Sequence, residues 1–255
     1  ETDFLKPNQQ FPSVDGKRSV QVYLARMREA VRDFESVAGT IHPGDFTMLP
    51  FHTPFPGMVR KAAALAYRHT IRDTEIEEEL AEDIGRQPRP EAFDSDEAYV
   101  DAMGEYTDKL VKTDNYLDWY DRVVDPTLEI SREVGNWYTG SVHVARASGL
   151  KHALENDMDL TGATLGVASY GSGAQAEVHA ETVQPGWEDE IAALNVDEQL
   201  ENRYSISYEE YEHIHDVHNH DKDTDAEAEA FTPAEGEFVF DGWGRMGERK
   251  YRYVA

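Results

Sequence analysis

The chain has 255 residues, with 51 acidic side chains against 24 basic ones, a formal charge of −27 and no cysteine. A surface this negative repels nucleic acid and anionic lipid, because binding either of them requires clustered lysine and arginine. The lack of cysteine excludes disulfides, thiolate metal sites and a cysteine nucleophile from these residues. We therefore expect neither nucleic acid nor a membrane as a partner.

The sequence also predicts a soluble, cytoplasmic protein. No apolar run approaches the roughly 18 residues of a membrane span, and the opening ETDFLKPNQQ lacks the basic-then-apolar order of a signal peptide. Acidic residues are spread over the whole chain. This distribution fits either an ordinary acidic protein or adaptation to high salt, where ions screen the mutual repulsion of carboxylates.

Helical and extended patterns alternate in the first part of the chain. Apolar side chains recur at three- and four-residue steps from Val20 to Val37, which predicts an amphipathic helix ending near Gly39. The apolar run FTMLPF at 46–51 predicts a buried strand, and the pattern from Gly57 to Arg72 predicts another helix. A strand, the loop HTPFP and a helix therefore follow one another.

The remaining segments predict further helices and a hairpin. Residues 73–125 and 197–235 are polar and mostly helical in character, and we interpret them as peripheral excursions from one core. Small residues in 134–153 predict a tightly packed helix. The stretches 163–170 and 174–183, on either side of a Gly-Ser-Gly turn, predict a hairpin whose first strand is buried.

Two short strands are predicted near the end, at 237–240 and 250–254. Buried strands and helices therefore interleave along the chain. This order predicts an α/β fold with helices covering a sheet.

Four segments carry residue types suited to a site. His52 follows the apolar strand, where burial would keep its imidazole neutral, although a structural core histidine is the plainer alternative. Asn136 follows a glycine at the start of a predicted helix, where it would cap the helix or orient a ligand. Tyr170, Gly171 and Ser172 stand at a strand end, where ligands commonly bind, and a tight turn explains them equally well.

The fourth segment is the opening, DFLKP, which contains Asp3 and precedes the sequence DGK. In this order the four segments resemble the hydroxymethylglutaryl-CoA synthase family of the thiolase superfamily. DFLKP with FPSVDGKRSVQVYL is similar to the family's DFYKP and YPVVDGKLS, FHTPFPGMVRKA to FHSPYCKLVQKS, GNWYTGSVHVARASGL to GNMYTSSLYLALASLL, and GVASYGSG to GVFSYGSG. The resemblance covers most of the chain, and the composition resembles that of a haloarchaeal member.

The resemblance implies a thiolase-like layered αβαβα fold, of which residues 1–255 would be the C-terminal half. It also implies an acyltransferase that condenses acetyl-CoA with acetoacetyl-CoA in the mevalonate pathway to isoprenoids, with no further cofactor. The family's nucleophilic cysteine and catalytic glutamate precede the DFYKP-like motif, at which this sequence begins. A missing N-terminal half would therefore supply both groups, this chain alone would be inactive, and the enzyme would be a homodimer.

The resemblance also implies roles for individual residues. His52 would hydrogen-bond the acetoacetyl group, and Asp3 would be a supporting active-site carboxylate. Asn136 would bind the acetoacetyl portion or its thioester. The residues that would line the acyl pocket are Tyr170, Gly171 and Ser172.

The contact with the phosphates of CoA is expected at Lys61, because a negative protein needs local positive charge to bind an anionic substrate. The family carries a lysine five residues after its histidine, and Gly57 occupies that position here. Part of the usual contact is therefore missing at this position, and Arg60 would compensate for it.

Three alternatives compete with this interpretation. The chain could be a non-catalytic module that binds CoA thioesters, or a β-branching relative that acts on carrier-protein thioesters. It could also bind a divalent metal through the histidines of EHIHDVHNHD, which are His213, His215, His218 and His220. A polar surface segment explains those histidines more simply, and the family chemistry needs no metal.

If the acidity is an adaptation to high salt, the chain should lose structure as salt is removed, because the repulsion between its carboxylates is then unscreened. Circular dichroism during stepwise dialysis from molar KCl measures this loss. An unchanged helical signal at low salt would instead identify an ordinary acidic protein.

Overall fold

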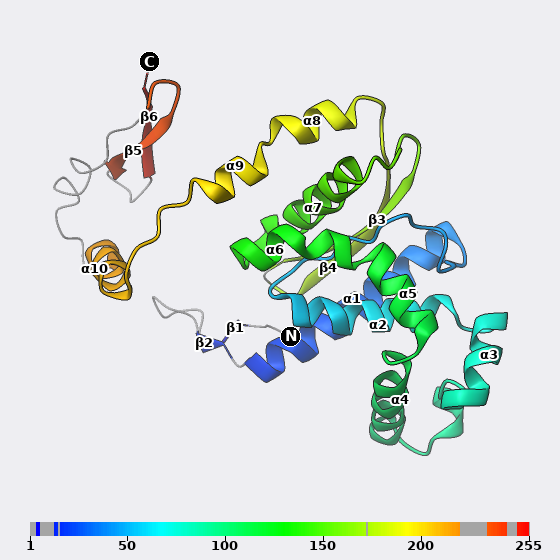
Figure 1. The fold of residues 1–255 in the computed structure, drawn as a ribbon. Helices are drawn as coiled ribbons and strands as arrows, with labels where there is room; N and C mark the ends of the chain where they lie inside the picture. The colour runs from blue at the N-terminus through cyan, green and yellow to red at the C-terminus, as the bar shows by residue number, and fades with distance from the viewer. Residues whose placement is uncertain are drawn as a thin grey trace. The chain divides into compact units, whose positions relative to one another are not determined.

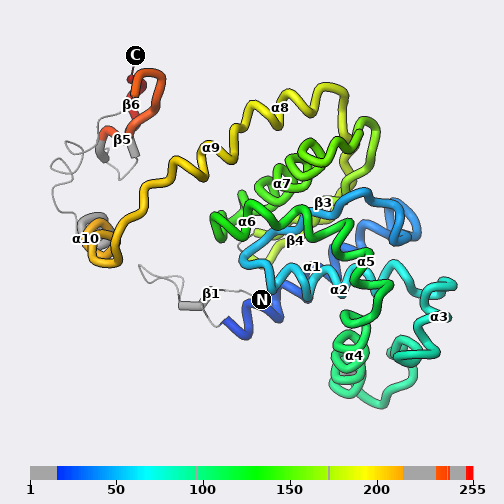
Figure 2. Tube along the Cα trace, in the orientation of Figure 1, coloured from blue at the N-terminus to red at the C-terminus, as the bar shows by residue number. Residues whose placement is uncertain are grey.

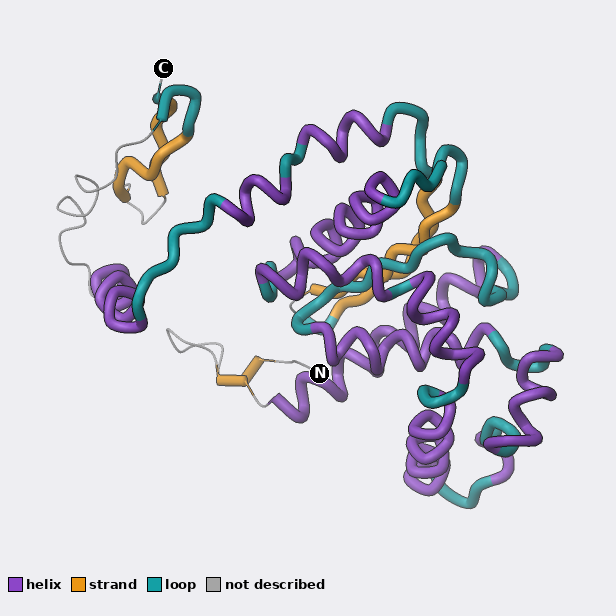
Figure 3. Tube along the Cα trace, in the orientation of Figure 1, coloured by secondary structure: helices purple, strands orange, loops and turns teal. Residues whose placement is uncertain are grey.

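The structure is a computed structural model that describes residues 4–5, 13–14, 16–171, 173–219, 234–243 and 249–254. The chain forms two compact units, residues 1–196 and 197–255 (Figure 1). Figure 2 follows the chain through the same view, and Figure 3 shows that helices dominate the first unit around a small set of strands. In these described ranges no helix has both the length and the apolar character to cross a membrane.

Three extended segments form the centre of the first unit. β3 (Thr164–Gly171) and β4 (Gln175–Thr182) pair in antiparallel register, as the sequence predicted. On the other side of β3, residues 47–52 run parallel to it, with bridges from Met48 to Leu165 and from Phe51 to Ala168. The predicted strand at 46–51 is therefore confirmed as an extended segment.

Helices cover both faces of β3. Its residues Ala168 and Tyr170 belong to the main core, together with α1 (Gly16–Ala38) and α2 (Pro56–Thr70). On the other face, Leu165 packs in a second cluster with α7 (Ser141–Glu155) and α8 (Trp187–Ala193). The buried strand and the first two helices are therefore confirmed, and the sheet lies between helical layers.

The stretch 73–125 is helical, as predicted. It contains α3 (Glu75–Ile84), the 3₁₀ turn η1 (Pro90–Ala92), α4 (Asp96–Leu110) and α5 (Asp114–Val123). α5 also adds aromatic side chains to the main core, where the ring centroids of Tyr116 and Trp119 lie 5.5 and 4.9 Å from that of Tyr67. Residues 73–125 therefore pack against α2 through the aromatic side chains of α5.

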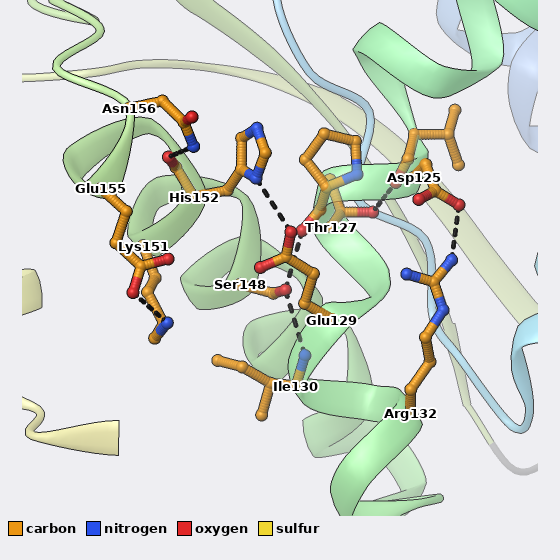
Figure 4. A network of polar contacts seen from close by, with 12 residues as sticks. Asp125, Thr127, Glu129, Ile130, Arg132, Ser148, Lys151, His152, Glu155 and Asn156 are labelled. Carbon is orange, nitrogen blue, oxygen red and sulfur yellow. Dashed lines mark hydrogen bonds and ion pairs between the residues drawn. The ribbon is translucent and has the colours of Figure 1, made fainter. Parts of the chain in front are cut away.

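A polar network joins the 3₁₀ turn η2 (Asp125–Leu128) and α6 (Glu129–Val134) to α7 (Figure 4). Ser148 Oγ donates to the carbonyl of Pro126 at 2.8 Å and accepts from the backbone N–H of Ile130 at 3.3 Å. His152 Nδ1 lies 2.9 Å from Glu129 Oε1. Ion pairs at the edge of the network are Arg132–Asp125 and Lys151–Glu155.

The network joins η2 and the start of α6 to the second half of α7. The helix predicted from residue 134 begins later, at Ser141, because Gly135 ends α6 with a φ of 73° and a 3₁₀ turn, η3 (Tyr138–Gly140), intervenes. Asn136 therefore lies in a loop and not at the first turn of a helix.

The second unit contains α9 (Val196–Glu201, which starts at the boundary), α10 (Tyr208–Asn219) and the antiparallel strands β5 (Phe238–Trp243) and β6 (Arg249–Tyr253). The predicted terminal strands are confirmed. Of the four candidate metal ligands, His213, His215 and His218 lie on α10, and His220 falls outside the described residues. In the part of the chain that the structure describes, no three histidine or carboxylate groups gather as a metal site. Near the N-terminus, β1 (Phe4–Leu5) pairs with β2 (Ser13–Val14).

Gly166 is expected to be essential to the packing of β3. A Cβ atom there would lie 2.7 Å from a ring carbon of Phe46 and 2.8 Å from Leu49 Cδ1, so Gly166→Ala should lower the free energy of unfolding. Overpacking of this kind costs about 1–3 kcal/mol. Denaturant titration at constant KCl measures the change.

The matched control is Gly104→Ala in α4, where a Cβ atom meets nothing within 4 Å. It should leave stability unchanged or raise it by about 1 kcal/mol, since alanine favours a helix over glycine. Equal destabilisation by the two substitutions would contradict the packing argument.

Candidate active site

His52 and Tyr170 lie together at the carboxyl ends of two parallel segments. The N–H of His52 donates to the carbonyl of Ala168 at 2.8 Å, which places His52 beside the last residues of β3. The rings of His52 and Tyr170 then stand 5.6 Å apart between centroids. Ligands in α/β folds commonly bind at this edge of a sheet, so the pairing brings two predicted site residues to a favourable place.

Tyr23 of α1 completes this aromatic group. Its hydroxyl donates to the carbonyl of His52 at 2.9 Å, and its ring packs edge-on against Tyr170 with centroids 5.2 Å apart. Burial, and then the neighbouring Tyr170, raise the pKa of Tyr23, so its hydroxyl stays protonated and remains a donor. Tyr23 falls within the apolar helical pattern from Val20 to Val37, which predicts its burial but not its contact with His52.

The His52 side chain is neutral at physiological pH. It is 5 % exposed, and burial lowers its pKa from 6.5 to about 4 because a low-dielectric environment disfavours the imidazolium ion. This confirms the neutral form expected from the sequence. Nδ1 is buried and makes no hydrogen bond within the described ranges, an arrangement that costs free energy unless a polar group binds there.

Asn136 is held by its side-chain oxygen. Oδ1 accepts hydrogen bonds from the backbone N–H of Tyr138 at 2.8 Å and from Ser141 Oγ at 3.0 Å. Tyr138, which donates the first of these bonds, has a φ of 51°, which is uncommon for a residue other than glycine. The residue that caps α7 is Gly140, so Asn136 does not cap that helix. In the described residues its amide nitrogen donates to no group.

The end of β3 contacts the loop that carries Asn136. A Cβ atom on Gly171 would lie 3.3 Å from Thr139 Cγ2, so only a small residue fits without displacing the loop. Tyr170, Gly171 and Thr139 line one cavity of about 870 Å³ that extends along β4. The predicted site residues Asp3 and Ser172 lie outside the described residues, and their roles stay predictions.

Lys61 lies elsewhere, on an exposed face of α2. It lines a cavity of about 430 Å³ between α1, α2 and α4, together with Gly57 and Arg60. A Cβ atom at Gly57 would lie 3.2 Å from the ring of Phe55, so a longer side chain there would displace that ring. The structure thus places Arg60 beside Lys61, while the family's lysine position holds no cation.

Burial of a neutral His52 predicts a specific pH dependence of stability. Between pH 6.5 and about 4 the unfolded chain binds a proton at this residue and the folded chain does not, so stability falls as the pH falls. The loss attributable to His52 is up to about 3 kcal/mol. NMR titration should find its ring neutral at a pH where a model imidazole is half protonated. A midpoint near 6.5 would contradict the burial argument.

A family model, a curated relative and solved structures all relate this chain to the same enzyme family. Residues 1–242 match the family described as hydroxymethylglutaryl-coenzyme A synthase C terminal. The chain is 64% identical over 254 residues to the hydroxymethylglutaryl-CoA synthase of Haloferax volcanii, and the alignment covers 100% of this chain and 57% of that protein. The chain therefore spans little more than half the length of this relative.

Two solved structures share the fold. MvaS in complex with 3-hydroxy-3-methylglutaryl coenzyme A superposes with a TM-score of 0.69 at 24% identity, covering 99% of this chain and 55% of that one. The HMG synthase of the curacin biosynthetic pathway, in complex with holo donor-ACP, gives 0.66 at 24%, covering 99% and 54%. The fold is thus thiolase-like, as the sequence resemblance implied. The chain belongs to the hydroxymethylglutaryl-CoA synthase family and corresponds to the C-terminal part of that enzyme.

Proposed function

We propose that this chain forms the acetoacetyl-binding half of an enzyme that condenses acetyl-CoA with acetoacetyl-CoA to hydroxymethylglutaryl-CoA, a step toward isoprenoids. The observation that carries the proposal is the neutral, buried His52, whose Nδ1 is unpaired within the described residues and which stands beside Tyr170 at a strand end. The identity of 64% to the Haloferax synthase over the full chain supports it.

The reaction requires groups from two parts of the enzyme. An acetyl group passes from acetyl-CoA to a cysteine of the N-terminal part, and free CoA leaves. A glutamate of that part removes a methyl proton, and the resulting carbanion attacks the ketone carbonyl of acetoacetyl-CoA, whose oxygen then takes up a proton. Water hydrolyses the enzyme thioester and releases the product.

The residues of this chain would bind and polarise the acetoacetyl group. A neutral imidazole donates one hydrogen bond without the cost of burying a charge, and the donor gains strength in a dry site as negative charge develops on the oxygen. The amide nitrogen of Asn136 would supply a second donor, because Oδ1 is anchored by Tyr138 and Ser141 and the nitrogen is left for the ligand. Tyr23 would position His52 through its main-chain carbonyl.

The CoA moiety would lie along α2. Lys61 and Arg60 line the same cavity, so Arg60 would take over part of the contact that Gly57 does not provide. Both cations would attract the phosphates to a protein that is otherwise strongly negative. We further propose a cytoplasmic homodimer, as the family resemblance implies.

A relative that acts on carrier-protein thioesters is the second candidate. The curacin HMG synthase, whose structure is a complex with donor-ACP, superposes almost as well as MvaS, with TM-scores of 0.66 and 0.69. The fold therefore accommodates either acyl carrier. The 64% identity to a hydroxymethylglutaryl-CoA synthase favours CoA.

His52→Ala should reduce condensation by about 10²–10³-fold, the usual loss for one donor to a developing oxyanion. The assay combines the chain with the N-terminal part of the synthase in molar KCl and follows the disappearance of acetoacetyl-CoA. We expect activity only when both parts are present.

The matched control is His69→Ala on α2, because His69 pairs with Glu35 at 2.7 Å and has no role in the proposed chemistry. Its activity should equal that of the unmodified assembly. Full activity of His52→Ala would refute the role of His52. Turnover with carrier-protein thioesters alone would establish the second candidate in place of the first.

A further inference from the structure

The second unit has no buried residue in its described part. Burial is described there for residues 197–214, 234–239, 241 and 251–254, and none of these is buried. The buried residues of both apolar clusters belong to the first unit. A folded unit is normally stabilised by the apolar surface that it removes from water. The described residues of the second unit therefore form no core of their own, and a contact outside them must stabilise it.

The hairpin of β5 and β6 carries an aromatic face (Figure 1). Phe238 lies opposite Tyr253 in the antiparallel register, and their ring centroids are 5.1 Å apart. Phe238 is 74% exposed and Tyr253 is 57% exposed, and Tyr251, on the same face of β6, is exposed as well. A single two-stranded hairpin is marginally stable in water. This hairpin therefore requires a surface that covers its aromatic face.

Helix α10 shows the same property. Tyr208, Tyr211 and Ile214 recur at three-residue steps, so they lie on one side of the helix, and all three are exposed. Tyrosine is common in protein–protein contacts, because its ring is apolar while its hydroxyl group tolerates water. Exposed apolar residues gathered on both elements indicate that the second unit binds a protein surface.

The first unit presents no matching apolar face among its described residues. Several of its exposed large apolar side chains lie on separate elements, namely Val37, Val100, Met158 and Leu194. The others lie in the loops that carry His52 and Asn136, and they are Phe55, Trp137 and Tyr138. Single apolar residues are ordinary on a protein surface and do not form a docking face. The partner of the hairpin is therefore sought outside residues 1–196.

Charge argues against the hairpin of a second copy as that partner. The sequence of β6, RKYRY, has three basic residues and no acidic one, although the whole chain has 51 acidic residues to 24 basic ones. Two such hairpins in contact would bring like charges together, which disfavours association. An apolar surface edged by carboxylates would attract the same strand.

The relatives contain a further part that can provide this surface. The alignment with the Haloferax synthase covers 100% of this chain, the hairpin included, but only 57% of that protein. The superposition on MvaS likewise covers 99% of this chain and 55% of that one. In both relatives a large part of the protein thus has no counterpart among these 255 residues.

We propose that the aromatic face of the β5–β6 hairpin, formed by Phe238, Tyr251 and Tyr253, docks on the N-terminal part of the synthase. The contact supplies the core that the described residues of the second unit lack. The inference rests on the proposed function for the presence of that part, and it deepens the proposal by naming the residues that hold the two parts together.

The test measures association of this chain with the N-terminal part by sedimentation velocity in constant KCl. Phe238→Thr and Tyr253→Thr should each weaken association about tenfold, as expected when an aromatic anchor is truncated. Threonine is used because it favours the strand conformation. The matched control is Arg252→Thr, because Arg252 lies on the opposite face of β6 and its ion pair with Asp241 is exposed. It should associate as tightly as the unmodified chain.

A second measurement uses the unmodified chain, so it does not depend on how the variants fold. Hydroxyl-radical labelling read by mass spectrometry should show that Phe238 and Tyr253 lose most of their reactivity when the N-terminal part is added. Unchanged reactivity would overturn the proposal. So would protection in the monomeric chain alone, which would place the hairpin on residues 1–196, or protection that accompanies self-association, which would identify a second copy.

Activity separates this inference from the proposed function. The hairpin variants should regain condensation at excess N-terminal part, because the hairpin has no role in the proposed chemistry. If the unmodified parts associate through the hairpin but do not condense the substrates, the proposed function alone is refuted. If they condense the substrates while the hairpin variants associate normally, this inference alone is refuted.

Discussion

The parallel pairing of residues 47–52 with β3 is the constraint on which the site depends. The hydrogen bond from the His52 N–H to the carbonyl of Ala168 is the last of that pairing. It places His52 beside the final residues of β3. β3 is buried on both faces, so its alternating side chains must serve two cores at once. Tyr170 consequently falls on the face of α1 and α2, where it meets His52 and Tyr23.

The two proposed donors are oriented by different means. His52 is positioned through its backbone, by Tyr23 and Ala168, which leaves Nδ1 of its ring unpaired within the described residues. Asn136 is positioned through its side-chain oxygen, which holds a left-handed residue in place. In both cases protein contacts satisfy one part of the residue and leave a polar nitrogen for the substrate. Such preorganisation is how a site stabilises developing charge without reorganising during the reaction.

Charge is distributed unevenly between the whole chain and the cavity along α2. The chain carries a formal charge of −27, which suits a concentrated electrolyte. It is 64% identical to the synthase of Haloferax volcanii. Against that background the cavity along α2 differs, because Arg28, Arg60, Lys61 and Arg68 line it and Asp108 is the one carboxylate among its described lining residues. Local positive charge of this kind retains anionic ligands even where salt weakens long-range steering.

The sequence by itself determined the family, the first two helices, the hairpin, the extended segment before His52 and the neutral state of its imidazole, because apolar periodicity and ordered motifs are local properties. It placed the start of α7 too early, because the small residues of 134–153 do not record that the backbone adopts positive φ at Gly135 and Tyr138. The structure also decided that Asn136 is anchored by its oxygen, a local contact where the sequence had left helix capping and ligand binding both open. Only the tertiary structure decided that Tyr23 holds His52 and that Arg28 and Arg68 share a cavity. The residues of those two contacts come from different elements, so the distance between them along the chain does not predict the distance between them in space.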